Sequence, residues 1–206
     1  MIDVLDSGLG NCGSVKRMIE HVGGTARIIR RADEILKSEK IVIPGVGHFD
    51  HGMNSLREHG LIEALKQRIV VENRTVLGIC LGMQMLCERS EEGKAEGLSF
   101  VRGTVQKFRF PEEVKLKIPH MGWNVVNPVK GSRLFSDSED ELRFYFVHSY
   151  HVVPSNSGIL SSYTDYGMDF CSSFESGNIF GVQFHPEKSH RFGMELMRRF
   201  LKSDLC

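Results

Sequence analysis

The chain has 206 residues, enough for one well-buried core, and we expect a single domain over residues 1–206. Its 26 lysines and arginines balance 26 aspartates and glutamates, which gives no electrostatic footprint for nucleic acid or an anionic membrane. No apolar run reaches the ~20 residues needed to span a bilayer, and "MIDVLDSG" lacks the pattern of a signal peptide. We therefore expect a cytoplasmic protein whose partners are small molecules or proteins.

The cysteine pattern favours a reducing compartment. The number of cysteines is odd and no two form a C-x-x-C pair, which argues against a disulfide scaffold or a thiolate zinc site. No His-x-x-x-His pair appears either, so we expect neither a metal nor another cofactor. The five cysteines are Cys12, Cys80, Cys87, Cys171 and Cys206.

Strand-like and helix-like segments alternate through the first ninety residues. The helices are expected near residues 12–22, 61–71 and 81–88, because apolar residues recur there at spacings of three and four. Such alternation predicts an α/β fold with an open, mostly parallel, doubly wound sheet and helices on both faces. The expected strands are "MIDVLD" (1–6), "ARIIR" (26–30), "KIVIPG" (40–45) and "TVLGI" (75–79).

Beyond about Leu98 the strand-like runs follow one another with few helical spacers, which predicts flanking antiparallel strands. A last helix is expected from Ser189 to about Lys202, with apolar residues at helical spacing. The strand-like runs are 103–110, 122–128, 142–154, 158–163 and 178–184.

The stretch "GLGNCG" (8–13) matches the dinucleotide-binding pattern G-x-G-x-x-G between a strand and a helix. That fingerprint also requires an acidic residue at the end of the second strand, where this chain has Arg30 and Arg31. A plain glycine-rich turn is therefore favoured over a nucleotide site.

The stretch "GICLG" places Cys80 between Gly78 and Gly82 at a junction of strand and helix. This is the layout of a nucleophile elbow, in which small neighbours permit a sharp turn and the N–H of the next residue, Leu81, can hold an oxyanion. The helix start would favour the thiolate. A buried structural cysteine is the alternative, and it suits Cys87 better.

A nucleophilic cysteine needs a base and a group that orients the base. "HPE" supplies both, because Pro186 favours an extended His185, and Glu187 then faces the same side. Most other histidines suit solvated positions, although His48, His120 and His148 stand in contexts that could line a site.

Five separated stretches carry a family resemblance. They are "PGVGHF" (44–49), "GICLGMQ" (78–84), "PHMGWN" (119–124), "YFVHSY" (145–150) and "FHPEKS" (184–189). Together they resemble the class I (triad) glutamine amidotransferases, and within these the glutaminase subunits of imidazole glycerol phosphate synthase, over essentially the whole chain.

The resemblance implies a Cys80–His185–Glu187 triad that hydrolyses L-glutamine through a glutamyl thioester. It also implies an oxyanion hole formed by the N–H groups of Leu81 and Val46, completed when the Gly45–Val46 peptide reorients. Four further residues would hold the glutamine: Gly47, Gln84, Ser149 and Tyr150. For two of these an alternative stays open, because Gln84 can be a solvated helix residue and Tyr150 a core residue.

The resemblance further implies that the partner is a (β/α)₈ cyclase subunit, in a heterodimer of histidine biosynthesis. The cyclase would receive the ammonia, make imidazole glycerol phosphate and AICAR, and stimulate the glutaminase. Residues matching that interface are Asn11, Met121, Trp123 and Lys188, although Trp123 can alternatively be a core aromatic. A paralogous glutaminase that feeds another barrel partner, for instance in surface-sugar amidination, also remains open.

Overall fold

The computed structural model describes residues 1–135 and 141–203. Its helices are α1 (Cys12–His21), α2 (Ala32–Ile35), α3 (Phe49–Glu58), α4 (Ile62–Lys66), α5 (Leu81–Met85) and α6 (His190–Lys202), with short π or 3₁₀ segments η1 (Gln67–Val71), η2 (Ser157–Ile159) and η3 (Pro186–Lys188). Its strands are β1 (Ile2–Leu5), β2 (Ala26–Ile29), β3 (Lys40–Gly45), β4 (Thr75–Cys80), β5 (Arg89–Ser90), β6 (Gly103–Lys107), β7 (His120–Pro128), β8 (Leu142–His148), β9 (Tyr150–Pro154), β10 (Leu160–Asp165), β11 (Asp169–Ser176) and β12 (Ile179–Val182).

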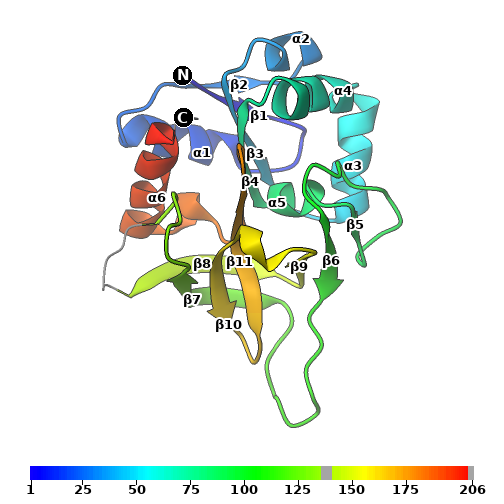
Figure 1. Ribbon diagram of the computed structural model, residues 1–206, viewed down its shortest axis with the longest axis vertical. Coiled ribbons are helices and arrows are strands. Elements are labelled where there is room, and N and C mark those ends of the chain that lie inside the picture. Colours follow the sequence, from blue (N-terminus) through cyan, green and yellow to red (C-terminus); the bar gives the residue numbers. More distant parts are fainter. Residues whose placement is uncertain (136–140, 204–206) are drawn as a thin grey trace.

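One sheet runs through the molecule in the order β2-β1-β3-β4-β12-β11-β10-β7-β8 (Figure 1). The strands from β2 to β12 pair in parallel, and those from β12 to β8 pair antiparallel. The parallel part has the strand order of a flavodoxin-like sheet. The expected α/β class with flanking antiparallel strands is confirmed.

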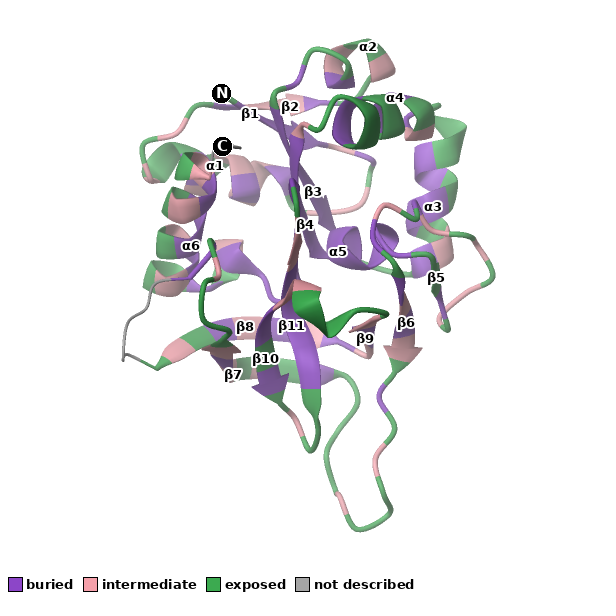
Figure 2. Cartoon of the chain, in the orientation of Figure 1, coloured by how far each residue is buried: buried purple, intermediate pink, exposed green. Residues whose placement is uncertain are grey.

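Side chains from successive residues of the parallel strands enter different cores, as strand geometry requires. On β3, Ile41 and Ile43 belong to the core under α3, α4 and α5, and Val42 belongs to the core under α1 and α6. The central strands and all of α5 are accordingly buried (Figure 2). Burial on both faces holds the C-terminal ends of β3, β4 and β12 in fixed relative positions.

Local sequence explains how α1 begins and ends. The side chain of Asn11 accepts a hydrogen bond from the N–H of Ser14 at 3.1 Å, so Asn11 is the N-cap. At the other end, the N–H groups of Gly23 and Gly24 bond to carbonyls of the last turn. Gly23, with φ of +91°, adopts the left-handed conformation that ends the helix.

Two of the expected helices differ from the structure. The helix expected over residues 81–88 ends at Met85. The Met85 carbonyl accepts a hydrogen bond from the N–H of Leu98 at 2.8 Å, and the carbonyls of Leu86 and Cys87 accept from N–H groups of residues 99–101, so none of them continues the helix. In the helix expected over 61–71, the N–H of Glu72 reaches back five residues to the Gln67 carbonyl, so the second half is π-helical.

Among the strands, β11 was not expected, and the run 142–154 divides into β8 and β9 around Ser149. None of the described helices is long and apolar enough to cross a membrane.

Candidate active site

Cys80 occupies the sharp turn between β4 and α5. Its backbone has φ of 54° and ψ of −110°, a positive φ that non-glycine residues rarely adopt. The residue is only 6% exposed. A strained cysteine at the end of a central strand has the geometry of a nucleophile elbow.

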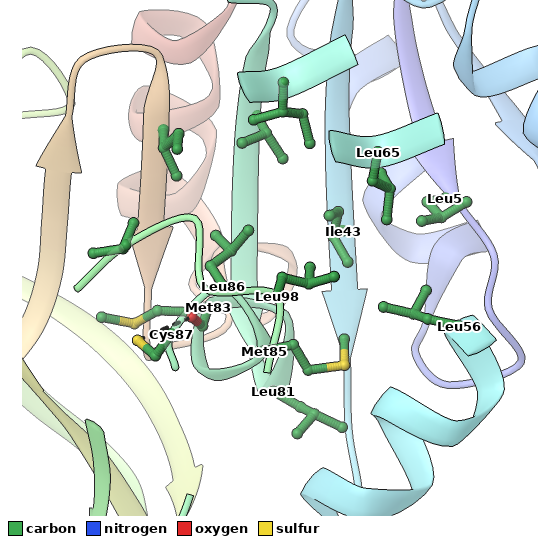
Figure 3. Packing of buried hydrophobic residues seen from close by; sticks show 14 of the residues in the cluster. Leu5, Ile43, Leu56, Leu65, Leu81, Met83, Met85, Leu86, Cys87 and Leu98 are labelled. Atoms are coloured by element: carbon green, nitrogen blue, oxygen red, sulfur yellow. Dashed lines mark hydrogen bonds between the residues drawn. The ribbon is translucent and has the colours of Figure 1, made fainter. Parts of the chain in front are cut away.

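The glycines on either side of Cys80 are required by space. A Cβ atom on Gly82 would lie 1.8 Å from the carbonyl oxygen of Ile43, and one on Gly78 would lie 2.6 Å from the carbonyl oxygen of Gly82. Leu81 and Met85 of the same helix pack with Leu56 of α3 (Figure 3). The elbow therefore packs closely against β3 on one side and α3 on the other. As expected, positions 78 and 82 have no room for a side chain.

His185 reaches the elbow from the neighbouring strand. Val182 at the end of β12 pairs with Ile79 of β4, so the chain leaving β12 passes beside Cys80. The Nδ1 atom of His185 lies 2.8 Å from Oε1 of Glu187, and their side chains are 1% and 4% exposed. The backbone N–H of His185 also donates to the carbonyl of Tyr145 at 2.9 Å.

The charge state of His185 is set by its neighbours. Burial opposes the charged imidazole, but interactions with Cys80 and Glu187 outweigh it and raise the pKa of His185 to about 9. The other ring nitrogen, Nε2, is buried and has no hydrogen-bond partner of good geometry among the described residues. A protonated imidazole beside a thiol suits an ion pair of thiolate and imidazolium.

The "PGVG" segment lies directly beside the elbow. Gly45 pairs with Cys80 in the ladder of β3 and β4, and a Cβ on Gly45 would lie 2.8 Å from the backbone nitrogen of Gly82. Val46 is 42% exposed, and Gly47 has φ of +111°. The segment thus continues from the end of β3, beside Cys80, to the solvent-exposed side of the elbow, where Val46 lies.

Gln84 is buried, so it is not a solvated helix residue. Its amide nitrogen donates to the carbonyl of Tyr150 at 3.1 Å and to Oε1 of Gln183 at 3.0 Å. Ser149 and Tyr150 are only partly buried, and burial raises the pKa of the Tyr150 hydroxyl. Tyr150 also packs against the core under α3, α4 and α5, so both alternatives for Tyr150 stay open.

Two polar residues near the elbow were not singled out from the sequence. Gln183 contacts Cys80 directly, and the carboxylate of Glu92 accepts from the N–H of Phe49 at 2.9 Å and is an electrostatic neighbour of Tyr150. Gln183 lies within the "GVQFHPE" stretch, two residues before His185, and this spacing could have identified it as a site residue. Glu92 lies in the turn after β5, and no sequence pattern marked it.

Burial opposes ionisation of the other described cysteines. Burial is the main cause that raises the pKa of Cys12 to about 11 and of Cys87 to about 12, and it also raises the pKa of Cys171. The structural interpretation of Cys87 is confirmed by its complete burial. Cys206 lies outside the described residues.

The residues expected at a partner surface are exposed. Met121 is 62% and Trp123 45% exposed, which excludes a core position for Trp123. The indole stacks on the His190 ring at 5.5 Å between centroids, and Lys188 lies over the Tyr145 ring at 5.6 Å.

The "GLGNCG" turn packs against the "PGVG" segment. A Cβ on Gly10 would lie 2.9 Å from the Pro44 carbonyl oxygen, so this turn packs against the start of "PGVG". Asn11, next in the chain, is exposed.

The remaining candidate histidines lie elsewhere. His48 is exposed and caps α3, its Nδ1 accepting from the N–H of Asp50 at 3.2 Å. His120 and His148 are buried and lie 3.0 Å apart, among the rings of Phe108, Phe146 and Phe170. Within residues 1–135 and 141–203, no group of three His, Cys, Asp or Glu side chains could hold a metal ion.

Known proteins share this sequence and this fold. The family model "Glutamine amidotransferase class-I" matches residues 3–203. The chain is 46% identical over 202 residues to "Imidazole glycerol phosphate synthase subunit HisH 2" of Methanococcus maripaludis, covering 98% of this chain and 99% of that one. The protein of the same name in Pseudomonas aeruginosa is 42% identical over 202 residues, with the same coverage.

Solved structures agree in fold. A structure titled "Crystal structure of glutamine amidotransferase" has a TM-score of 0.75 at 17% identity, covering 98% of this chain and 97% of that one. Another, "Structure of PurLQS from Thermotoga maritima", has a TM-score of 0.73 at 16% identity, with the same coverage. With the sequence matches over nearly the full length, these findings establish that the chain belongs to the class I glutamine amidotransferase family, and within it to the HisH subunits of imidazole glycerol phosphate synthase.

Proposed function

We propose that the protein is the glutaminase subunit of an imidazole glycerol phosphate synthase and hydrolyses L-glutamine to glutamate and ammonia. The observation that carries the proposal is the strained Cys80 at the elbow, beside the buried pair of His185 and Glu187. Family membership supports the substrate class, and the geometry supports the roles proposed for these residues.

The reaction runs in two stages. The Cys80 thiolate attacks the side-chain amide carbon of glutamine, and the His185 imidazolium gives its proton to the departing nitrogen, so ammonia leaves and a glutamyl thioester remains. His185, now neutral, takes a proton from water, which attacks the thioester and releases glutamate. Glu187 holds the imidazole in one tautomer and stabilises its cation.

Each tetrahedral intermediate carries a negative oxygen that needs donors. The N–H of Leu81, the residue after the nucleophile, is one donor, and the N–H of Val46 is the other. Reorientation of the Gly45–Val46 peptide completes this hole, and glycine on both sides of Val46 lowers the cost of such a change.

Binding of free glutamine requires groups for its ammonium and its carboxylate. Gly47, Gln84, Ser149 and Tyr150 line the substrate side of the elbow. The amide nitrogen of Gln84 is already engaged, so its amide oxygen is the atom offered to substrate. We assign the ammonium group to Glu92, the carboxylate with the largest electrostatic effect on Tyr150.

The ammonia passes to a cyclase subunit that covers the open side of the site. Exposed apolar side chains such as Val46, Met121 and Trp123 support a docking surface there. Asn11 and Lys188 belong to the same interface, and binding of the cyclase's ribonucleotide substrate stimulates the glutaminase through the Gly45–Val46 peptide.

Covalent labelling tests the nucleophile. A diazoketone analogue of glutamine is incubated with the protein, and the modified peptides are mapped by mass spectrometry. Labelling confined to Cys80, with both labelling and glutaminase activity lost in Cys80→Ser, is the expected result. Labelling of another cysteine with Cys80 untouched would overturn the proposal.

The partner is tested separately. Two of the relatives are named "HisH 2". Such a number suits a protein that is one of several copies, and copies can serve different partners. Glutaminase activity that responds to no histidine-pathway cyclase would assign the protein to the paralogue with another barrel partner.

A further inference from the structure

Gln183 is completely buried, and its amide nitrogen lies 3.7 Å from the sulfur of Cys80. We propose that Gln183 is a further catalytic residue, which donates a hydrogen bond to the Cys80 sulfur and thereby stabilises the thiolate that attacks substrate. The inference rests on the proposed function, in which Cys80 is the nucleophile.

The fold delivers Gln183 and His185 to the sulfur together. Gln183 directly follows β12, whose last residue pairs with Ile79 just before Cys80. Its backbone N–H donates to the Ser172 carbonyl at 2.9 Å, so the chain stays in the sheet at this point. The chain bends at Gln183 and Phe184, and the amide and the imidazole both reach Cys80 from this one short segment.

The orientation of the Gln183 amide is fixed by partners whose roles are unambiguous. The carbonyl of Tyr150 can only accept, so the Gln84 atom 3.1 Å from it is the donating nitrogen. That nitrogen also lies 3.0 Å from the Gln183 amide, which must present its oxygen there. The remaining Gln183 atom, the one facing sulfur, is therefore the NH₂ group.

A second set of buried bonds holds the Tyr150 carbonyl itself. His148 Nδ1 lies 2.8 Å from this carbonyl and must carry the proton, so His148 Nε2 accepts from Nδ1 of His120 at 3.0 Å. His120 Nε2 in turn accepts from the Asn124 amide at 3.2 Å. Burial lowers the pKa of His120 to about 4 and of His148 to about 3, so both stay neutral and this donor order persists at neutral pH.

The bond from Gln183 matters because the sulfur has a competing neighbour. The Cys80 thiol lies 4.0 Å from the Val147 carbonyl, which can accept its proton and so favours the neutral thiol. An N–H donor favours the ionised form instead, and hydrogen bonds to charged acceptors are the stronger kind. Together with the His185 cation, Gln183 shifts the balance towards thiolate in a buried site.

The test measures the rate of Cys80 alkylation by iodoacetamide against pH, followed by mass spectrometry of the Cys80 peptide. Gln183→Met keeps the length of the side chain without a donor, and Gln183→Glu places a carboxylate beside the sulfur. The matched control is Asn178→Leu, which removes a buried amide at the opposite end of β12, where the Asn178 side chain donates to the carbonyls of Ile69 and Arg74.

We expect the alkylation midpoint of Cys80 to rise by about one pH unit in Gln183→Met and further in Gln183→Glu, and to stay unchanged in Asn178→Leu. At pH values below both midpoints this is roughly a tenfold slower alkylation, with a fall in kcat and an unchanged KM. If Gln183→Met does not fold, by circular dichroism, Gln84→Met tests the same bond, because it releases the Gln183 amide and shifts the midpoint in the same direction.

An unchanged midpoint in folded Gln183 variants would overturn the inference while Cys80→Ser still abolished activity. Retention of activity in Cys80→Ser would instead overturn the proposed function, and the alkylation profiles would still decide whether Gln183 stabilises the thiolate.

Discussion

The Nδ1 atom of His185 lies 2.8 Å from Oε1 of Glu187, and both side chains are almost completely shielded from solvent. This pair, together with Cys80, keeps the pKa of His185 near 9 against the effect of burial. Protonated His185 is present below that pH and is lost as the pH rises through it. Glutaminase activity should therefore fall on the alkaline side near pH 9.

Replacing Glu187 by Gln tests this relationship. The amide removes the negative charge that favours the imidazolium, so kcat should fall by roughly 10²- to 10⁴-fold and the alkaline limb should move to lower pH. Residual activity of the variant is measured from pH 6 to 10. An unchanged alkaline limb would show that His185 does not lose its proton there.

The elbow should not tolerate a methyl group at Gly82. Gly82→Ala places a Cβ 1.8 Å from the Ile43 carbonyl oxygen, which forces β3 and α5 apart, and we expect a loss of about 3 kcal/mol or more in the free energy of unfolding. Urea denaturation measures it. The control is Gly13→Ala in α1, where a Cβ would lie 3.5 Å from its nearest neighbour, the Arg17 guanidinium, and where alanine should add about 0.5–1 kcal/mol. Equal stability of the two variants would contradict this account.

The strands and helices that position the site follow closely from sequence, because β3 and β4 are apolar runs buried on both faces and Asn11 and Gly23 mark the ends of α1. The Cys80 elbow was also predictable, because a strand-to-helix turn has fixed geometry. The His185–Glu187 pair was expected from an extended chain, but Glu187 lies in the 3₁₀ segment η3, so the two side chains meet through a turn instead. β11 was missed because its interior is serine-rich. Ser172 and Ser173 are buried there and lie 2.8 and 2.6 Å from the Ser162 hydroxyl, so tertiary hydrogen bonds replace the apolar pattern that identifies strands. Gln183 and Glu92 were missed because their partners are far away in sequence.

Trp123 should contribute to binding the cyclase without contributing to stability. Its indole is 45% exposed, so Trp123→Ala should leave the unfolding temperature nearly unchanged and weaken the complex by about 2 kcal/mol, roughly 30-fold in Kd. Calorimetric titration with the cyclase subunit measures this change. Tyr163→Ala is the control, since Tyr163 is an aromatic residue of similar exposure, 38%, on β10. Equal affinities of the two variants for the cyclase would show that Trp123 is not part of the interface.

Glu92 should set the affinity for glutamine. Glu92→Gln removes the carboxylate assigned to the substrate ammonium group, and we expect KM to rise about tenfold with a smaller change in kcat. Glu91→Gln is the matched control, because the adjacent carboxylate is engaged by the N–H of Lys107 and by Arg109. The assignment fails if both variants keep the KM of the unmodified protein.

In the proposed mechanism, Cys80 hydrolyses glutamine under the control of a cyclase subunit. The most direct test is glutamate release from L-glutamine by the purified protein, alone and with a histidine-pathway cyclase plus its ribonucleotide substrate, in parallel with Cys80→Ala. The account predicts weak release by the free protein, strong stimulation in the complex, and loss of both in the variant. Glutamate release that survives Cys80→Ala would contradict it.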